Sequence, residues 1–340
     1  MGYFTNTVNL GNWYPIVCVY ENGNWNKCIY NPNGDPFYSQ VANYSVTLTL
    51  PSTYTLATTG IITEKNTKNP LNTVWTVRAD KVRDFACVFS QNFKLKSAIY
   101  DNIIVYSYYI GDDKYGQKAL DTGVNAIKTF NEMFGKYPYD QISIVSCDFY
   151  IGGMEYPNMV MINKDLYASN TIDALEEVVA HEVAHQWWYG VVGNDEINKA
   201  WLDESLTHYS TMMYYEKTYG DQRFKEAMSS SKSYYCATIQ VLKATGVDFN
   251  EKIDRPSSSF NDWRLYDVLV YDKGAMMLDS IRGAVGDKKF FDSLKEYYST
   301  NMYKNVTEKE LISAFNKKSG IDVTSIMNPW LSGNVVLPAA

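Results

Sequence analysis

The stretch His181-Glu182-Val183-Ala184-His185 decides how this chain is interpreted, together with Glu204, which follows nineteen residues later in Trp201-Leu202-Asp203-Glu204. Two histidines four positions apart lie on one face of a helix, about one turn apart, so both imidazoles can bind a single metal ion. Glu182 lies beside them, where it can hold a water molecule, and Glu204 offers a third, carboxylate ligand. Three protein ligands leave one position open, which is typical of a catalytic zinc site.

A helix over residues 171–189 is predicted around the two histidines. Asn170 and Asp173 are placed to form a capping box at its start, and Gly190 favours its end. Such a helix has a broad apolar stripe, formed by Ile172, Leu175, Val178, Val179, Val183, Ala184 and Trp188. We therefore expect it to be largely buried. Histidines inside a buried helix need polar partners, and a metal ion provides one.

The HExxH pattern is short and also occurs by chance in helices that bind no metal. Two features favour the metal interpretation: the chain has only three histidines, two of them in this motif, and Glu204 follows at a spacing that suits a ligand. We interpret the third histidine, His208, as a helix residue with a polar partner near the site. A fourth protein ligand would close the catalytic position.

Composition describes a globular protein whose 340 residues are enough for two domains. Tyrosine is abundant, with 29 residues, which suits broad packed surfaces or an extended substrate cleft. The net charge is −7 and no cluster of lysine and arginine occurs, so a nucleic-acid partner is not expected. An acidic cleft would favour cationic substrates such as the amino termini of peptides.

The five cysteines are scattered and form no CxxC pair, which argues against a thiolate metal site. Cys18 and Cys28 could meet in a hairpin and form a disulfide in an oxidising compartment. No apolar run approaches 18 residues, so no transmembrane segment is expected. The first residues lack the features of a signal peptide, and we expect the chain to be a fragment of a longer protein. A cytoplasmic location is favoured, whereas the compartment and the oligomeric state stay open.

Residues 1–110 are predicted to form a β-sandwich domain, because short alternating stretches separated by turn residues recur along them. From residue 115 the apolar spacing changes to that of helices, so residues 111–340 are predicted to form a second domain. The elements expected there are a helix at 117–134, strands at 141–147 and 159–162, the two helices of the metal motif, and helices around 221–245, 272–285, 287–300 and 307–318.

Two further segments carry groups that could act on a substrate. Gly152-Gly153-Met154-Glu155-Tyr156 precedes the metal motif, and its glycines would let the backbone approach a ligand closely. Val270-Tyr271-Asp272-Lys273-Gly274 begins another predicted helix, from which Tyr271 could donate its O–H to an oxyanion. Taken alone, the glycine segment is better explained as an ordinary glycine turn with a surface glutamate, and Tyr271 is readily explained as one tyrosine among many.

These four motifs, in this order, resemble the aminopeptidase N family of gluzincins. The family pattern is GxMEN, HExxH, eighteen residues and a glutamate, then a tyrosine before a Lys-Gly pair. This chain has eighteen residues between His185 and Glu204, whereas thermolysin-type enzymes have one more. The fold that the resemblance implies is α+β. An N-terminal β-sandwich domain, here partial, precedes a thermolysin-like, mainly helical catalytic domain with a small mixed sheet, and a helical C-terminal domain often follows.

The resemblance also implies a role for each motif residue. His181, His185 and Glu204 would bind one Zn²⁺ per chain, and Glu182 would be the general base. Tyr271 would stabilise the tetrahedral intermediate. Residues of the glycine motif would bind substrate: Glu155 the α-amino group, and Gly152 and Gly153, as an edge strand, the peptide backbone.

Three departures from the family pattern stand out. Tyr156 replaces the asparagine that usually follows the motif glutamate, which bears on how Glu155 is oriented. Asp203-Glu204-Ser205 replaces the commoner Asn-Glu-Gly, a change that we expect to leave the ligand itself unaffected. The chain is also short at both ends. The first half of the β domain, where the family places a second group for the substrate amine, is not recognisable, and no C-terminal helical domain is expected.

The function expected from the resemblance is that of a zinc aminopeptidase acting on peptides with a free N-terminus. A thermolysin-type zinc endopeptidase is the nearest alternative, and Glu155 distinguishes the two because an amine anchor beside the metal blocks internal cleavage. An epoxide hydrolase on the same fold is a further alternative. The last is a non-catalytic peptide-binding module with the same fold, which would be expected to have lost ligands or the base.

Overall fold

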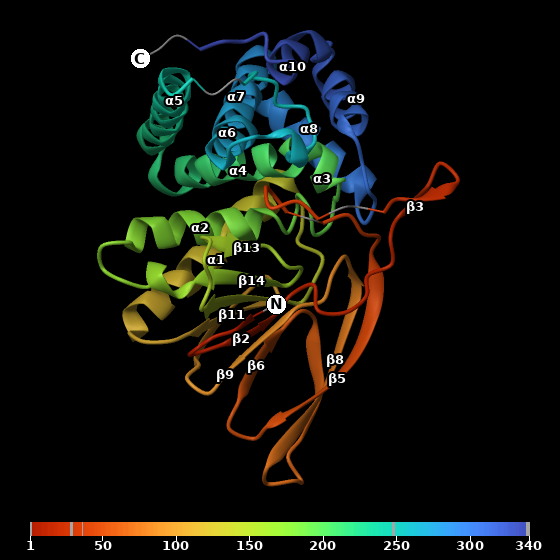
Figure 1. Ribbon diagram of the computed structural model, residues 1–340, viewed down its shortest axis with the longest axis vertical. Coiled ribbons are helices and arrows are strands. Elements are labelled where there is room, and N and C mark those ends of the chain that lie inside the picture. Colours follow the sequence, from red (N-terminus) through yellow and green to blue (C-terminus); the bar gives the residue numbers. More distant parts are fainter. Residues whose placement is uncertain (1, 28–29, 36, 247–248, 338–340) are drawn as a thin grey trace. The chain divides into compact units, whose positions relative to one another are not determined.

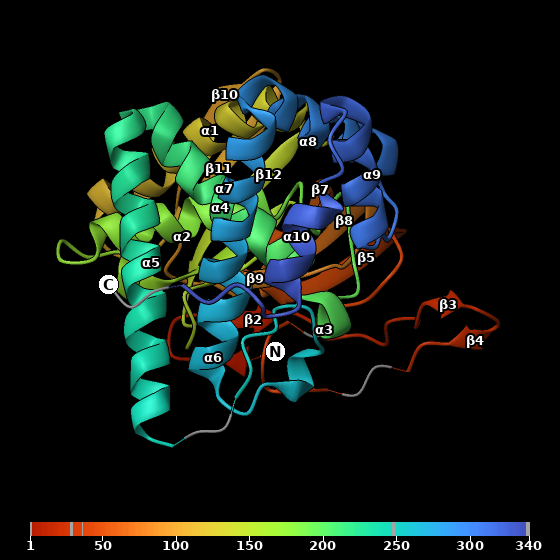
Figure 2. The ribbon, with the colours of Figure 1, turned by 90° about the horizontal axis from the view of Figure 1, so that it is seen from above.

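The computed structural model describes residues 2–27, 30–35, 37–246 and 249–337 (Figures 1 and 2). These residues divide into two compact units. The first unit draws on residues 1–17, 39–128 and 136–186, and the second draws on residues 18–38, 129–135 and 187–340.

Two antiparallel sheets in the first unit form the predicted β-sandwich. One has the strand order β1-β2-β9-β6 and the other β5-β8-β7. Their strands are β1 (Gly2–Tyr3), β2 (Val8–Leu10), β5 (Ala42–Pro51), β6 (Thr55–Thr58), β7 (Ile61–Asn66), β8 (Asn72–Val82) and β9 (Cys87–Ser90). Alternation selects the buried face: in β5, Leu48 and Leu50 are buried whereas Thr49 between them is exposed.

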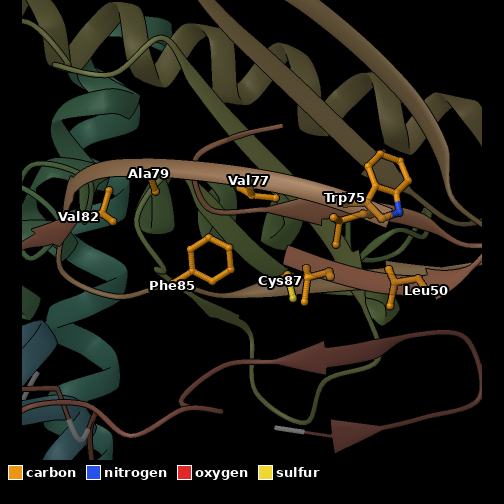
Figure 3. Packing of buried hydrophobic residues seen from close by; sticks show 9 residues of the cluster. Leu50, Trp75, Val77, Ala79, Val82, Phe85 and Cys87 are labelled. Atoms are coloured by element: carbon orange, nitrogen blue, oxygen red, sulfur yellow. The ribbon is translucent and has the colours of Figure 1, made fainter. Parts of the chain in front are cut away.

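The core of the sandwich lies between these two sheets, and Figure 3 shows how its side chains meet. β8 contributes Trp75, Val77 and Ala79 from alternate positions, which therefore point to one face. Leu56 of β6 and Cys87 of β9 come from the other sheet. Each large apolar side chain buried in this way contributes about 1.5–3 kcal/mol to folding.

A carboxylate is buried at one end of this core. Asp84 Oδ1 lies 2.7 Å from Tyr14 Oη and accepts the backbone N–H of Phe85, and Tyr14 Oη lies 2.8 Å from Tyr44 Oη. Burial raises the pKa of Asp84 to about 6, and the hydrogen bonds from Tyr14 and Phe85 offset only part of that effect. The folded protein therefore holds this proton more tightly than the unfolded chain.

Beside the two sheets of the sandwich, the first unit contains the small mixed sheet, with strand order β10-β11-β12-β14-β13. Its members are β10 (Lys94–Tyr100), β11 (Ile103–Tyr109), β12 (Gln141–Cys147), β13 (Gly153–Met154) and β14 (Met159–Asn163). β12 pairs in parallel with β11 and β14, and the outer pairs are antiparallel. Strands from both sides of the boundary proposed at residues 110/111 thus share this sheet, and the domain division stays a prediction.

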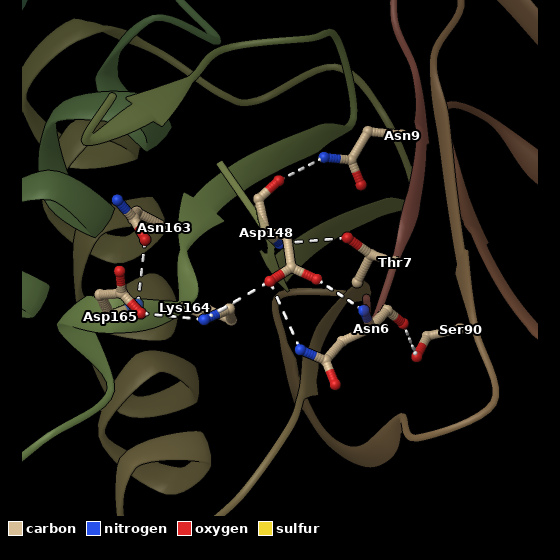
Figure 4. A network of polar contacts seen from close by, with 8 residues as sticks. All are labelled: Asn6, Thr7, Asn9, Ser90, Asp148, Asn163, Lys164 and Asp165. Atoms are coloured by element: carbon tan, nitrogen blue, oxygen red, sulfur yellow. Dashed lines mark hydrogen bonds and ion pairs between the residues drawn. The ribbon is translucent and has the colours of Figure 1, made fainter. Parts of the chain in front are cut away.

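A polar network ties the N-terminal segment to this sheet (Figure 4). Asp148, which follows β12, accepts the backbone N–H of Asn6 at 2.8 Å, and its own backbone N–H donates to Thr7 Oγ1. Its carbonyl oxygen accepts Asn9 Nδ2 at 2.7 Å, and Lys164 Nζ lies 3.4 Å from its carboxylate. The first two strands of the sandwich are therefore held against the sheet that carries the glycine motif.

Three helices complete the first unit: α1 (Asp113–Phe134), whose last residues belong to the second unit, the 3₁₀ turn η1 (Lys164–Leu166), and α2 (Ile172–Ala184). The predicted start of α2 is confirmed within one residue, whereas its predicted cap and its predicted end were wrong. Thr171, not Asn170, precedes the first turn and no side chain caps it, so the predicted capping box does not form. The helix ends at Ala184, with His185 as its C-cap, instead of running on to Gly190. The chain then turns, because Tyr189 takes a φ of +126°, which no helix accommodates.

In its described residues, the second unit is helical apart from a small hairpin. Its elements are β3 (Tyr20–Glu21), β4 (Asn24–Trp25), α3 (Glu196–Lys199), α4 (Trp201–Tyr219), α5 (Asp221–Ala244), the 3₁₀ turn η2 (Ser257–Ser259), α6 (Trp263–Asp267), the π-helical turn η3 (Val268–Lys273), α7 (Gly274–Val285), α8 (Asp287–Asn301), α9 (Glu308–Ser319) and α10 (Thr324–Leu331). The predicted helices at 221–245, 287–300 and 307–318 are confirmed within one or two residues. α9 begins with a capping box between Thr307 and Glu310 and ends at Gly320 in the left-handed region.

The α+β fold class is confirmed by these elements. No helix in the described part of the chain is long and apolar enough to cross a membrane. Cys28 lies outside the described residues, so its pairing with Cys18 stays a prediction.

The buried carboxyl of Asp84 leads to a prediction about pH. Its folded pKa, about 6, exceeds the ordinary value of 3.8, so its protonated form adds stability that is complete below pH 3.8 and is lost as the pH rises through 6. Asp84→Asn keeps an oxygen acceptor without the charge. The free energy of unfolding of this variant, relative to that of wild type, should therefore rise by up to about 3 kcal/mol between pH 4 and pH 7.5. Urea unfolding of both proteins at the two pH values measures these free energies. If the variant differed from wild type by the same amount at both pH values, the prediction would be contradicted.

Candidate metal centre

Helix α2 brings the two motif histidines together. His181 Nε2 and His185 Nε2 lie 3.2 Å apart, with their ring planes at 79°. Two nitrogen ligands of one tetrahedral zinc, each at 2.0–2.1 Å from the metal, would lie about 3.3 Å apart. The separation and the chemistry of the donors therefore fit a shared zinc ion, and this part of the expected site is already arranged in the first unit.

Two glutamates of the first unit gather beside these imidazoles. Glu155, Glu182 and His185 offer donor atoms that all lie within 4.8 Å of one another, and all three side chains are buried. Glu182 comes from the last turn of α2 and Glu155 from the turn after β13. Burying charged groups so close together is costly unless a cation or a proton compensates them. This cluster is therefore suited to bind positively charged groups.

The glycine motif forms an edge of the mixed sheet. β13 pairs only with β14 in that sheet, and Gly152 O accepts the backbone N–H of Asn163 at 2.9 Å. A Cβ atom at Gly153 would overlap Glu182 Oε1 and lie 2.5 Å from its Cδ. At Gly152 a Cβ would lie 3.5 Å from a methyl group of Val178, an ordinary contact. Gly153 is thus required because the carboxylate of Glu182 packs against its backbone.

Gln186, to which the sequence motifs assigned no role, holds the turn that carries Glu155. Its Nε2 donates to the carbonyl oxygens of Glu155 at 3.3 Å and Tyr156 at 3.2 Å, and its Oε1 accepts the backbone N–H of Asn158 at 2.9 Å. The side chain of Tyr156 packs against Gly11, where a Cβ atom would overlap its hydroxyl. Glu155 is therefore positioned through its backbone by Gln186.

The second unit brings together Glu204 and Tyr271. Tyr271 donates its hydroxyl hydrogen to Glu204 Oε1 over 2.5 Å. Burial and the nearby charge of Glu204 raise the pKa of Tyr271 well above its ordinary value, so the phenol stays protonated at neutral pH. His208, one turn after Glu204, has its Nε2 3.5 Å from Asp272 Oδ1, in agreement with its interpretation as a helix histidine with a polar partner.

Tyr271 lies in the π-helical turn η3, inside a continuous helical stretch of α6, η3 and α7, and not at a helix start as predicted. Ser205, one of the departures from the family pattern, contacts this turn. Its hydroxyl donates to the carbonyl oxygen of Val270 at 2.6 Å and packs against Gly274, where a Cβ would overlap it. A side chain that captures a helix carbonyl widens the turn, which is typical of π segments at functional sites.

A family model of the peptidase family M1 domain matches residues 118–330. The chain belongs to peptidase family M1. The match covers both motif helices, the π-helical turn with Tyr271 and the segment with Glu155.

The curated aminopeptidases that this chain matches are similar to it only at low sequence identity. This chain is 28% identical to mitochondrial aminopeptidase 2 of Saccharomyces cerevisiae over 260 residues, which are 73% of this chain and 26% of that protein. It is 27% identical to aminopeptidase N of Lactococcus lactis over 229 residues, or 63% of this chain and 26% of that one. The chain thus spans about a quarter of the length of the curated relatives it matches.

The fold is shared with solved M1 structures. A mutant M1 zinc metallopeptidase from Deinococcus radiodurans, crystallised with a Tyr-Ser-Ala substrate, superimposes with a TM-score of 0.68 at 16% identity. The match covers 88% of this chain and 66% of that one. At this identity the likeness concerns the fold alone.

The contact between Gly153 and Glu182 leads to a prediction. Gly153→Ala should push the carboxylate of Glu182 away. With Glu182 as the expected general base, this should lower kcat/KM for the expected peptide hydrolysis by roughly 100-fold, since a displacement of about 1 Å of a reacting group costs that much. Gly152→Ala is the matched control and should stay within a fewfold of wild type, because its Cβ has room. Equal rates for the two variants would show that the contact is irrelevant to the activity.

Proposed function

We propose that this chain is the catalytic part of a zinc-dependent aminopeptidase. The observation that carries the proposal is the arrangement in the first unit, where two imidazole nitrogens 3.2 Å apart lie with the carboxylates of Glu155 and Glu182. His181, His185 and Glu204 are the proposed zinc ligands. The assignment of Glu204 is supported by its spacing of eighteen residues from His185 and by the membership of family M1.

Each residue around the proposed ligands has a separate role in the proposed peptide hydrolysis. A bound zinc ion would supply Lewis acidity and lower the pKa of a water molecule. Glu182 takes a proton from the attacking water and passes it to the leaving amine. Tyr271 donates a hydrogen bond to the oxyanion of the intermediate. Because its hydroxyl has one hydrogen, it must exchange its bond to Glu204 for that contact.

Glu155 makes the proposed enzyme an aminopeptidase. Its carboxylate pairs with the protonated α-amine of the peptide, a charge-assisted contact that fixes which bond reaches the reacting groups. Gly152 and Gly153 bind the peptide backbone from the open edge of the sheet, in the manner of an added strand. The proposed partners are accordingly peptides with a free N-terminus. A thermolysin-type endopeptidase would have no use for an acidic group that anchors the amine.

The metal content tests the ligand assignment. We expect roughly one zinc per chain in the wild type and strong zinc loss in His185→Ala, since two ligands bind zinc far more weakly than three. His208→Ala is the matched control and should keep its zinc. Elemental analysis after dialysis, with thermal unfolding to check the fold, measures both. Full occupancy in a folded His185→Ala protein would remove these residues from the site.

The substrate preference tests Glu155. Glu155→Ala should lower kcat/KM on peptides with a free amine by roughly 10- to 150-fold, the usual worth of a hydrogen bond to a charged group, while zinc is retained. Glu177→Ala, an exposed glutamate of α2, should have no such effect. The wild type should cleave N-acetylated peptides poorly. Mass spectrometry of the products decides the matter: cleavage at internal bonds, or equal cleavage of free and acetylated peptides, leaves the endopeptidase as the better account.

A further inference from the structure

Gln186 joins the metal helix to the turn that carries Glu155. It follows His185 directly, at the point where α2 ends, and its side chain is buried. Through one amide group it binds three backbone groups of residues 155–158: the carbonyl oxygens of Glu155 and Tyr156 and the N–H of Asn158. Two segments some thirty residues apart in the chain are thus held together at one place.

The same turn is fixed from its other side. Asn158 takes a φ of +60°, a left-handed conformation that asparagine tolerates better than most residues. Its Nδ2 donates to Tyr137 Oη at 3.1 Å, and Tyr137 Oη donates to the carbonyl oxygen of Gln141 at 2.9 Å, at the start of β12. The backbone N–H of Ser143 donates to the carbonyl oxygen of Asn158. Gln186 therefore connects α2 to a turn that the mixed sheet already holds.

We propose that Gln186 is a positioning residue that sets where Glu155 stands relative to His185, and so determines how strongly a free α-amine is preferred. This inference rests on the proposed function of Glu155 as the amine anchor. It explains why Tyr156 is tolerated in place of the family's asparagine. The hydrogen bonds that hold Glu155 run through the main chain and Gln186, whereas the phenol of Tyr156 packs against Gly11.

The three backbone groups that Gln186 binds require a neutral amide side chain at this position. An amide offers both a donor for the two carbonyl oxygens and an acceptor for the N–H of Asn158. A glutamate would present oxygens to those carbonyl groups and would add a negative charge against the backbone of the turn that carries Glu155. A methionine has nearly the same volume but makes none of these hydrogen bonds. Gln186→Met therefore removes the hydrogen bonds with little change in packing.

The test measures binding instead of turnover. In a Glu182→Gln background, calorimetry gives the dissociation constants of tri-alanine and N-acetyl-tri-alanine, and their ratio reports the preference for a free amine. We expect the acetylated peptide to bind roughly 10- to 100-fold more weakly in this parent protein. Adding Gln186→Met should lower that ratio by roughly tenfold while the zinc content stays unchanged.

Gln141→Met is the matched control, because Gln141 also donates its side-chain amide to a carbonyl oxygen, that of Gly60, in the same unit. It should leave the ratio unchanged even if it lowers stability. Tyr137→Phe is a second, milder variant that removes the acceptor of Asn158 Nδ2, and it should lower the ratio by roughly threefold. It keeps the inference testable if Gln186→Met does not fold.

Three results would overturn the inference. A folded Gln186→Met protein that keeps the parent ratio within twofold shows that Gln186 does not position Glu155. An unchanged ratio in Tyr137→Phe shows the same if Gln186→Met does not fold. If the two peptides bind the parent protein equally, so that the ratio is near 1, Glu155 is not an amine anchor and the inference fails with the proposed function. If the parent prefers the free amine but Gln186→Met does not change the ratio, only the inference fails.

Discussion

The close approach of two imidazole nitrogens on one buried helix is the constraint on which the rest of the site depends. Such nitrogens cannot be left without polar partners in a protein interior, and a spacing of 3.2 Å between His181 Nε2 and His185 Nε2 suits a single tetrahedral metal ion. α2 presents them from a helix whose buried side carries Leu175, Val179 and Val183. The helix contacts β13 and β14 of the mixed sheet, so the metal motif and the glycine motif belong to one rigid arrangement.

The chemistry proposed for the site follows from how its carboxylates are distributed. Glu182 packs against the backbone of Gly153, which leaves no space for a side chain there, and Glu155 is held through its main chain by Gln186. In the proposed mechanism one of these carboxylates accepts a proton and the other binds the substrate amine. In the second unit, Glu204 and Tyr271 are already hydrogen-bonded to each other, which keeps a protonated phenol beside a proposed ligand.

Much of this could be predicted from the sequence because local spacing determines it. The four-residue interval of the histidines needs only helical geometry, and the strand at 141–147 was predicted with both ends as the structure has them. The sandwich core likewise follows from alternation in β5 and β8. The predictions failed where contacts between residues far apart in the sequence determine the local structure. The role of Gln186 depends on the turn at residues 155–158, the end of α2 goes with the positive φ of Tyr189, and Ser205 contacts the π-helical turn from some sixty-five residues away.

The central claim is that His181, His185 and Glu204 hold one catalytic zinc ion. Anomalous diffraction at the zinc absorption edge, from crystals of the zinc-loaded protein, tests it most directly. We expect one strong peak about 2.0–2.2 Å from Nε2 of both histidines and from a carboxylate oxygen of Glu204, with one open position. A peak bound instead by Glu155, Glu182 and His185, the other group of donors in the first unit, would contradict the account, as would zinc bound at neither group.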